Sequence, residues 1–112
     1  MDVMSERACM PYFILFYEVV DDFPLKRTPF RAQHLQQVQD AHDRGELLMA
    51  GVLAEPADRA VLVFRVDGRS AVEEFARSDP YVANGLVTRW QVRSWMQVIA
   101  TKPDEDALVK HS

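Results

Sequence analysis

The stretch PYFILFYEVV, residues 11–20, constrains the fold of this chain more than any other segment. Its aromatic and β-branched residues are typical of a β-strand, but apolar and polar side chains do not alternate along it. Both faces of such a strand are apolar, so both faces of its sheet must be covered. Any fold for this sequence therefore has to cover a sheet on two sides.

The segment TPFRAQHLQQVQDAHDRG, residues 28–45, has the pattern of a helix. Thr28 is the expected N-cap and Gly45 the expected stop, and residues 21–27 before it are expected to form a loop. The sector that should be apolar contains, at helical spacing, Leu35, Val38 and Ala41, but also Arg31, His34 and His42.

Three further strands are expected, over residues 46–55, 60–66 and 87–99. Gly51 interrupts the first of these and indicates a bulge or a close backbone approach. In the last strand, Trp90 and Met96 are expected to lie in the core.

A second helix is expected to open with Ser70 and Glu73, which have the spacing of a capping box. It should end near Ser78, because Pro80 disfavours helical geometry at the residue before it. A further helical turn after Pro80 would close at Gly85.

The order β-α-β-β-α-β matches the ferredoxin-like arrangement, an α+β fold in which a four-stranded antiparallel sheet carries both helices on one face. Residues 11–100 are expected to form this single domain, between an N-terminal extension at 1–10 and a flexible charged tail at 101–112. Two helices cover only one face, so we expect a homodimer in which two sheets face each other around an enclosed space.

The composition limits the classes of molecule that the protein is expected to bind. A net charge of −4 without a cluster of Lys and Arg argues against nucleic acid and anionic membranes. The longest apolar stretch is far shorter than the ~20 residues of a membrane span. A single cysteine, Cys9, fits a reducing compartment. We therefore expect a cytoplasmic protein whose partners are a second copy of itself and a small molecule.

Three polar residues each allow two interpretations. His34 is either a partly buried histidine that bonds to the backbone or a functional group. Arg31, one turn earlier, either extends its stem to water or binds an anion. Asp79 is either an N-cap before Pro80 or a carboxylate that orients an imidazole. His34 and His42 are too far apart for a two-histidine helix site, and no third ligand is evident, so neither metal nor cofactor is expected.

Three motifs in this order resemble the YciI-like (YCII-related) family: RAQHL at residues 31–35, GELLMAG at 45–51 and SDPYVANGL at 78–86. The resemblance covers about residues 11–99. It implies the dimeric α+β barrel, in agreement with the two-sided apolar strand. It also implies that His34 and Asp79 form a His-Asp pair in a pocket.

The resemblance further implies general acid and base chemistry by His34 and Asp79, namely elimination, dehydrochlorination or isomerisation of a hydroxylated aromatic compound or a lactone. Arg31, Gly51 and Tyr81 are the expected substrate-binding residues, for a ligand that is anionic or aromatic. The chain departs from the family where Val52 follows Gly51 in place of a common proline, so the substrate does not carry over. Two alternatives stay open: a dimer that binds a small molecule without turnover, and an accessory domain with an inert pocket.

Overall fold

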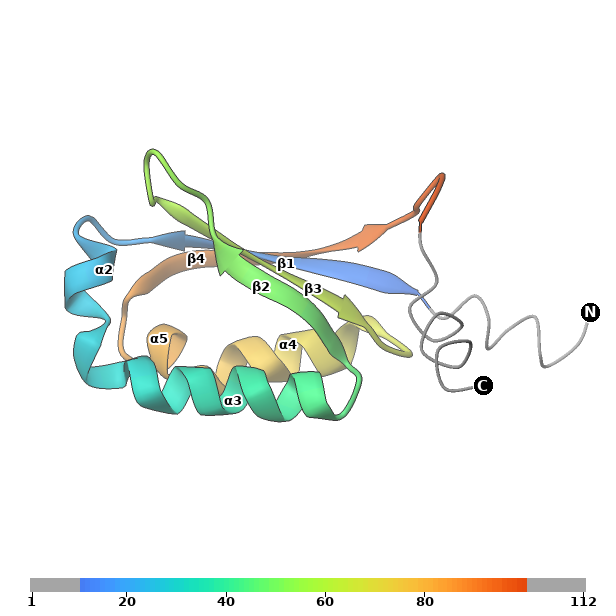
Figure 1. Cartoon of the computed structure of the whole chain (residues 1–112), viewed down its shortest axis with the longest axis horizontal. Coiled ribbons are helices and arrows are strands. Elements are labelled where there is room, and N and C mark those ends of the chain that lie inside the picture. The colour runs from blue at the N-terminus through green and yellow to red at the C-terminus, as the bar shows by residue number, and fades with distance from the viewer. Residues whose placement is uncertain (1–10, 101–112) are drawn as a thin grey trace, which may run out of the picture.

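The computed structural model describes residues 11–100, so the extension at 1–10 with Cys9 and the tail at 101–112 lie outside the described residues. Four strands form one antiparallel sheet in the order β2-β3-β1-β4 (Figure 1). The strands are β1 (Tyr12–Val19), β2 (Leu47–Val52), β3 (Arg59–Arg65) and β4 (Val87–Trp95). This is the ferredoxin-like α+β topology, as expected.

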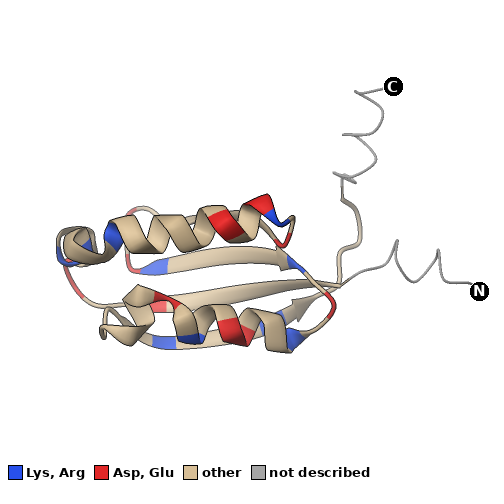
Figure 2. Cartoon of the chain, turned by 90° about the horizontal axis from the view of Figure 1, so that it is seen from below, with Lys and Arg blue, Asp and Glu red and all other residues tan. Residues whose placement is uncertain are grey.

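The helices all lie on one side of this sheet, where α3 and α4 run side by side (Figures 1 and 2). They are α2 (Phe23–Lys26), the 3-10 helix η1 (Thr28–Phe30), α3 (Arg31–Asp43), α4 (Arg69–Ser78) and α5 (Pro80–Ala83). Within residues 11–100, none of them is long and apolar enough to cross a membrane.

Alternate side chains of β1 point to opposite faces of the sheet. Phe13, Leu15 and Tyr17 are buried against the helices, whereas Ile14 and Phe16 point the other way and are half-buried. Ile14 pairs with Val63 and Phe16 with Val61 on β3, so the middle of the second face is also apolar. The two-sided strand thus leaves an apolar sheet face that no described element covers (Figure 1).

The helix that was expected to start at Thr28 starts later, and the loop before it contains α2. Thr28 lies in the 3-10 helix η1, and the N-cap of α3 is Phe30, which makes no capping hydrogen bond through its side chain. The physical reason is that Arg27 is already helical (φ −74°, ψ −14°), so the chain does not enter α3 from an extended cap residue.

The expected stop at Gly45 is confirmed. Gly45 has φ +80°, a conformation in which a glycine is favoured. Its N–H donates to the His42 carbonyl at 2.9 Å, and the Glu46 N–H donates to the Ala41 carbonyl at 3.0 Å. These two bonds form a Schellman motif, which returns the chain toward β2.

Two expectations for the strands were wrong. The irregularity of β2 falls between Leu47 and Met49, whereas Gly51 pairs regularly with Val61. The last strand ends at Trp95 instead of continuing to residue 99, because Trp95 pairs with Tyr12, the first residue of β1, and residues 11–100 offer no partner strand beyond it. Met96 is therefore 87% exposed and does not belong to the core.

The second helix begins at Arg69, after an extended Gly68 that serves as N-cap, so Ser70 lies inside the helix and the capping box is not formed. Its expected end at Ser78 and the following turn are confirmed, with α5 closing before Gly85 at φ +76°. Asp79 is extended (φ −69°, ψ 125°), as a residue before a proline should be.

Candidate functional site

Asp79 is a fully buried carboxylate and the single residue between α4 and α5. Its Oδ1 accepts the backbone N–H of Tyr81 at 2.9 Å, which caps α5. The same oxygen lies 2.9 Å from Nδ1 of His34 on α3, 45 residues away in the sequence. One carboxylate therefore both caps a helix and contacts the imidazole.

The second oxygen of Asp79 is held by a residue that the sequence did not single out. The Tyr17 hydroxyl, on the helix-facing side of β1, donates to Oδ2 at 2.6 Å. Three donors from β1, α3 and α5 thus converge on one buried carboxylate, which satisfies its lone pairs without solvent. Each donor comes from a different element, so the carboxylate also ties the sheet to both helices.

His34 is fixed by this carboxylate and by an aromatic ring. Its imidazole stacks on Tyr81 with ring centroids 4.0 Å apart and planes 15° from parallel, and its side chain is 14% exposed. A carboxylate only accepts hydrogen bonds, so the hydrogen lies on Nδ1 of His34. Nε2 is the nitrogen left for a ligand.

A pocket of about 280 Å³ lies between α3 and the helix-facing side of β2 and β3. Ala50, Val52, Ala60 and Leu62 form its aliphatic wall, and His34, Arg31 and Tyr81 lie among the residues around it. Gly51 is also in its lining, as are Tyr17, Phe23 and Arg27. All five residues that the sequence suggested for the site meet here, with Asp79 directly behind His34.

The pocket explains why the inner sector of α3 is polar. Ala41 is the only buried residue of this helix, and Leu35 is 47% exposed. Arg31 is exposed rather than buried, since α3 borders the pocket at this end instead of packing on the sheet. His42 has a structural role, because its Nδ1 bonds to the Leu47 carbonyl at 2.8 Å.

Two tyrosines of the site have a raised pKa. Burial raises the pKa of Tyr17 far above its ordinary value, and the charge and hydrogen bond of Asp79 raise it further. Burial also raises the pKa of Tyr81. The positive charges of Arg27 and Arg31 lower this pKa, whereas the negative charge of Asp79 raises it. Both phenols are therefore neutral hydrogen-bonding groups at physiological pH.

Tyr17 and Arg27 are the site residues that sequence reasoning missed. A phenol in the middle of a buried strand needs a partner for its hydroxyl, and this signal could have marked Tyr17. Arg27 lies in the segment that was expected to be a loop, where nothing in the sequence distinguishes it from Lys26. Across residues 11–100, no three His, Cys, Asp or Glu side chains gather as a metal site would require.

Solved structures with this fold share little sequence with the chain. A 5-chloro-2-hydroxyhydroquinone dehydrochlorinase from Burkholderia phenoliruptrix, in complex with 2,5-dihydroxybenzoquinone, has a TM-score of 0.65 at 16% identity, covering 77% of this chain and 94% of that one. A dimeric ferredoxin-like protein from an uncultured marine organism has a TM-score of 0.52 at 11% identity, covering 88% and 99%. At such identities the likeness shows the fold alone.

Comparison with curated protein sequences gives no match. The YCII-related domain family, in contrast, matches residues 10–96, a range that contains every strand and helix described above. It also contains His34, Asp79 and the other residues around the pocket. The resemblance seen in the sequence is confirmed, and the chain belongs to the YCII-related domain family.

Proposed function

We propose that this protein is a small enzyme in which His34 transfers protons and Asp79 orients it. The observation that carries the proposal is the 2.9 Å contact between His34 Nδ1 and Asp79 Oδ1, made behind the wall of a pocket that His34 lines. An aspartate on Nδ1 fixes the tautomer of the imidazole and stabilises the imidazolium. Nε2 can then accept a proton from a substrate and return it.

The reaction class that suits such a pair is elimination or isomerisation on an activated ring or lactone. In a dehydrochlorination, Nε2 of His34 would accept a substrate proton, and the electron pair left behind would form a new π bond. Chloride would leave with its bonding electrons, so the net change is the loss of one proton and one chloride. In an isomerisation, the imidazolium would return the proton to another carbon.

The pocket supports a substrate of about one ring. Its volume of about 280 Å³ suits a substituted single ring, and its wall is mostly aliphatic and aromatic. Arg31 would bind negative charge on the substrate or on the transition state, while Gly51 and Tyr81 would line the bound ring. The dehydrochlorinase with this fold was solved with 2,5-dihydroxybenzoquinone, a ring of this size, which supports the same class of ligand.

We also propose that the functional unit is a homodimer. The sheet face opposite the helices presents Ile14 and Phe16, both half-buried in the single chain, beside Val61 and Val63. A sheet with apolar residues at its centre is stabilised when a second sheet covers it. The dimeric ferredoxin-like protein of the same fold supports this arrangement.

The test is turnover of defined compounds by matched histidine variants. Chloride release from 5-chloro-2-hydroxyhydroquinone and ring isomerisation of small lactones would be measured for the wild type, His34→Ala and His42→Ala. His42 is the control, since it lies on the same helix but bonds to a backbone carbonyl outside the pocket. We expect His34→Ala to lose about 10²- to 10⁴-fold in kcat and His42→Ala to keep its activity.

Two outcomes would contradict the proposal. If His34→Ala turned over a substrate as fast as the wild type, His34 would not be the acid or base. If the wild type bound ring compounds saturably but formed no product from any of them, the protein would be a binding module instead of an enzyme.

A further inference from the structure

We infer that Arg27 and Arg31 together bind a negatively charged group of the substrate, so that the pocket selects a planar organic anion whose charge is shared by two oxygen atoms, as in a carboxylate. This inference rests on the proposed function because it concerns the same pocket. It names the substrate class and adds Arg27 to the site, and it can be tested by binding without any turnover.

The charged side chains that line the pocket are all positive. Arg27 and Arg31 line it, and its lining contains no acidic side chain. Asp79 lies behind His34, fully buried, with its oxygens already bound by three donors. Within residues 11–100, neither guanidinium has a carboxylate within ion-pair distance. Two positive charges therefore border one pocket without a counter-charge from the part of the chain that the structure describes.

Arg27 is seated on the pocket wall. Its Cζ lies 5.4 Å from the ring centroid of Phe23, within the range of a cation–π contact. Phe23 is buried and packs edge-on against Tyr81, with centroids 5.2 Å apart at 86°. Tyr81 in turn stacks on His34. A continuous row of rings thus connects the guanidinium of Arg27 to the imidazole.

The two guanidinium groups both act electrostatically on Tyr81. Both lower the pKa of the Tyr81 hydroxyl, so both lie within electrostatic reach of one residue that lines the pocket. The charge along α3 fits this arrangement, because its acidic residues, Asp40 and Asp43, lie in the half of the helix away from Arg31 (Figure 2). The end of α3 nearest the pocket is therefore the positive end.

The chemistry of arginine points to a full anion rather than a neutral ring. A guanidinium presents paired N–H groups that match the two oxygens of a carboxylate, and such charge-assisted bonds are about twice as strong as neutral ones. A neutral diol or lactone would leave two cations without a counter-charge in the complex. An acid group at Arg27 and Arg31 would place the rest of a single ring along the aromatic row toward His34.

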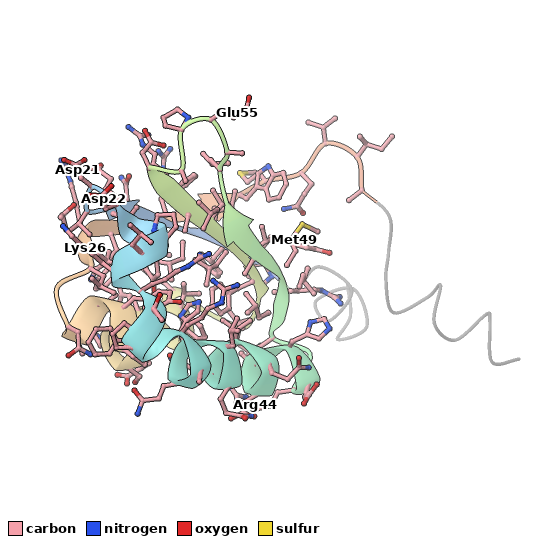
Figure 3. The ribbon with its side chains drawn as sticks, turned by 60° about the vertical axis from the view of Figure 1, so that its left-hand side comes forward. Asp21, Asp22, Lys26, Arg44, Met49 and Glu55 are labelled. Atoms are coloured by element: carbon pink, nitrogen blue, oxygen red, sulfur yellow. The ribbon has the colours of Figure 1, made fainter. Side chains whose placement is uncertain are left out.

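The test compares two probes of nearly the same shape, benzoate and benzamide, in NMR titrations of the wild type, Arg27→Met, Arg31→Met and Lys26→Met. Lys26 is the matched control, since it precedes Arg27 in the chain but is exposed and outside the pocket lining (Figure 3). We expect benzoate to bind the wild type about tenfold or more tightly than benzamide. Each arginine variant should lose about tenfold for benzoate only, and Lys26→Met should change neither probe.

Equal affinity for the two probes would overturn the inference, as would no binding of benzoate at millimolar concentration. An equal loss of both probes in the arginine variants would also overturn it, because it would indicate a structural role. His34→Ala separates this inference from the proposed catalysis. If that variant kept both turnover and the preference for benzoate, the catalytic proposal would fail while the anion site stood.

Discussion

Tyr81 stacks on His34 with ring centroids 4.0 Å apart, and its backbone N–H donates to the carboxylate that His34 contacts. One residue thus positions both members of the pair, the imidazole through its ring and Asp79 through its main chain. The short sequence Asp79-Pro80-Tyr81 makes this possible, because the proline starts α5 directly after the extended aspartate. The site therefore depends on a local motif, to which α3 adds the histidine and β1 the tyrosine.

We expect the carboxylate of Asp79 to contribute both to the stability of the fold and to turnover. Asp79→Asn keeps the shape but loses the charge and one full acceptor, so we expect unfolding free energy to fall by about 1–3 kcal/mol. Turnover should fall by about 10²- to 10⁴-fold, because the imidazole loses its orienting partner. Urea denaturation and steady-state kinetics measure the two effects. Asp67→Asn, an exposed residue, is the control and should change neither.

Tyr17 should give the protein a specific sensitivity to alkali. Its pKa in the folded protein is raised above that of the unfolded chain, which is 10.0, so above that pH the folded state keeps a proton that the unfolded state releases. Its contribution to stability is complete below pH 10 and is lost progressively above it. At neutral pH, Tyr17→Phe should cost about 1–3 kcal/mol, because Oδ2 of Asp79 loses its donor.

Above pH 10 the difference in unfolding free energy between the wild type and Tyr17→Phe should shrink, by up to about 1.4 kcal/mol per pH unit. Urea denaturation between about pH 8 and pH 11 measures this slope. Tyr12→Phe, at a position on the opposite face of the sheet, is the control for removing a hydroxyl. Parallel pH profiles for the wild type and Tyr17→Phe would show that the hydroxyl is not held as described.

The open sheet face is expected to hold the dimer together. Phe16→Glu places a charge at the centre of the apolar face, where burial without a partner is costly, so light scattering should show a monomer. Leu25→Glu is the matched control, because Leu25 is apolar and 76% exposed but lies on α2, away from this face. A wild-type protein that is monomeric at micromolar concentration would contradict the dimer.

Much of the fold could be predicted because its signals are local. The two-sided apolar strand, the stop at Gly45 and the helix end before Pro80 all depend on residues a few positions apart. Errors arose where the outcome depends on a distant partner. The last strand ends at Trp95 because β1 begins at Tyr12, and no pattern within residues 87–99 contains that information.

For the candidate site, too, the residue types could be predicted but the contacts between distant segments could not. The residue types of His34 and Asp79 could be read from the sequence, and the family resemblance paired them. Their 2.9 Å contact depends on how α3 crosses the sheet, which the spacing of 45 residues does not determine. Tyr17 was missed because in the sequence it looks like one more apolar strand residue. Its hydroxyl bonds to Asp79, which is 62 residues away along the chain.

The most direct test is the tautomer of His34, read from long-range ¹H–¹⁵N NMR spectra at alkaline pH, with its signals identified by their loss in His34→Ala. We predict that Nδ1 carries the hydrogen and Nε2 is unprotonated in the wild type, and that Asp79→Ala loses this preference. A wild-type His34 with its hydrogen on Nε2 would contradict the central claim, because its unprotonated nitrogen would be Nδ1, which contacts Asp79 and is not available to a substrate.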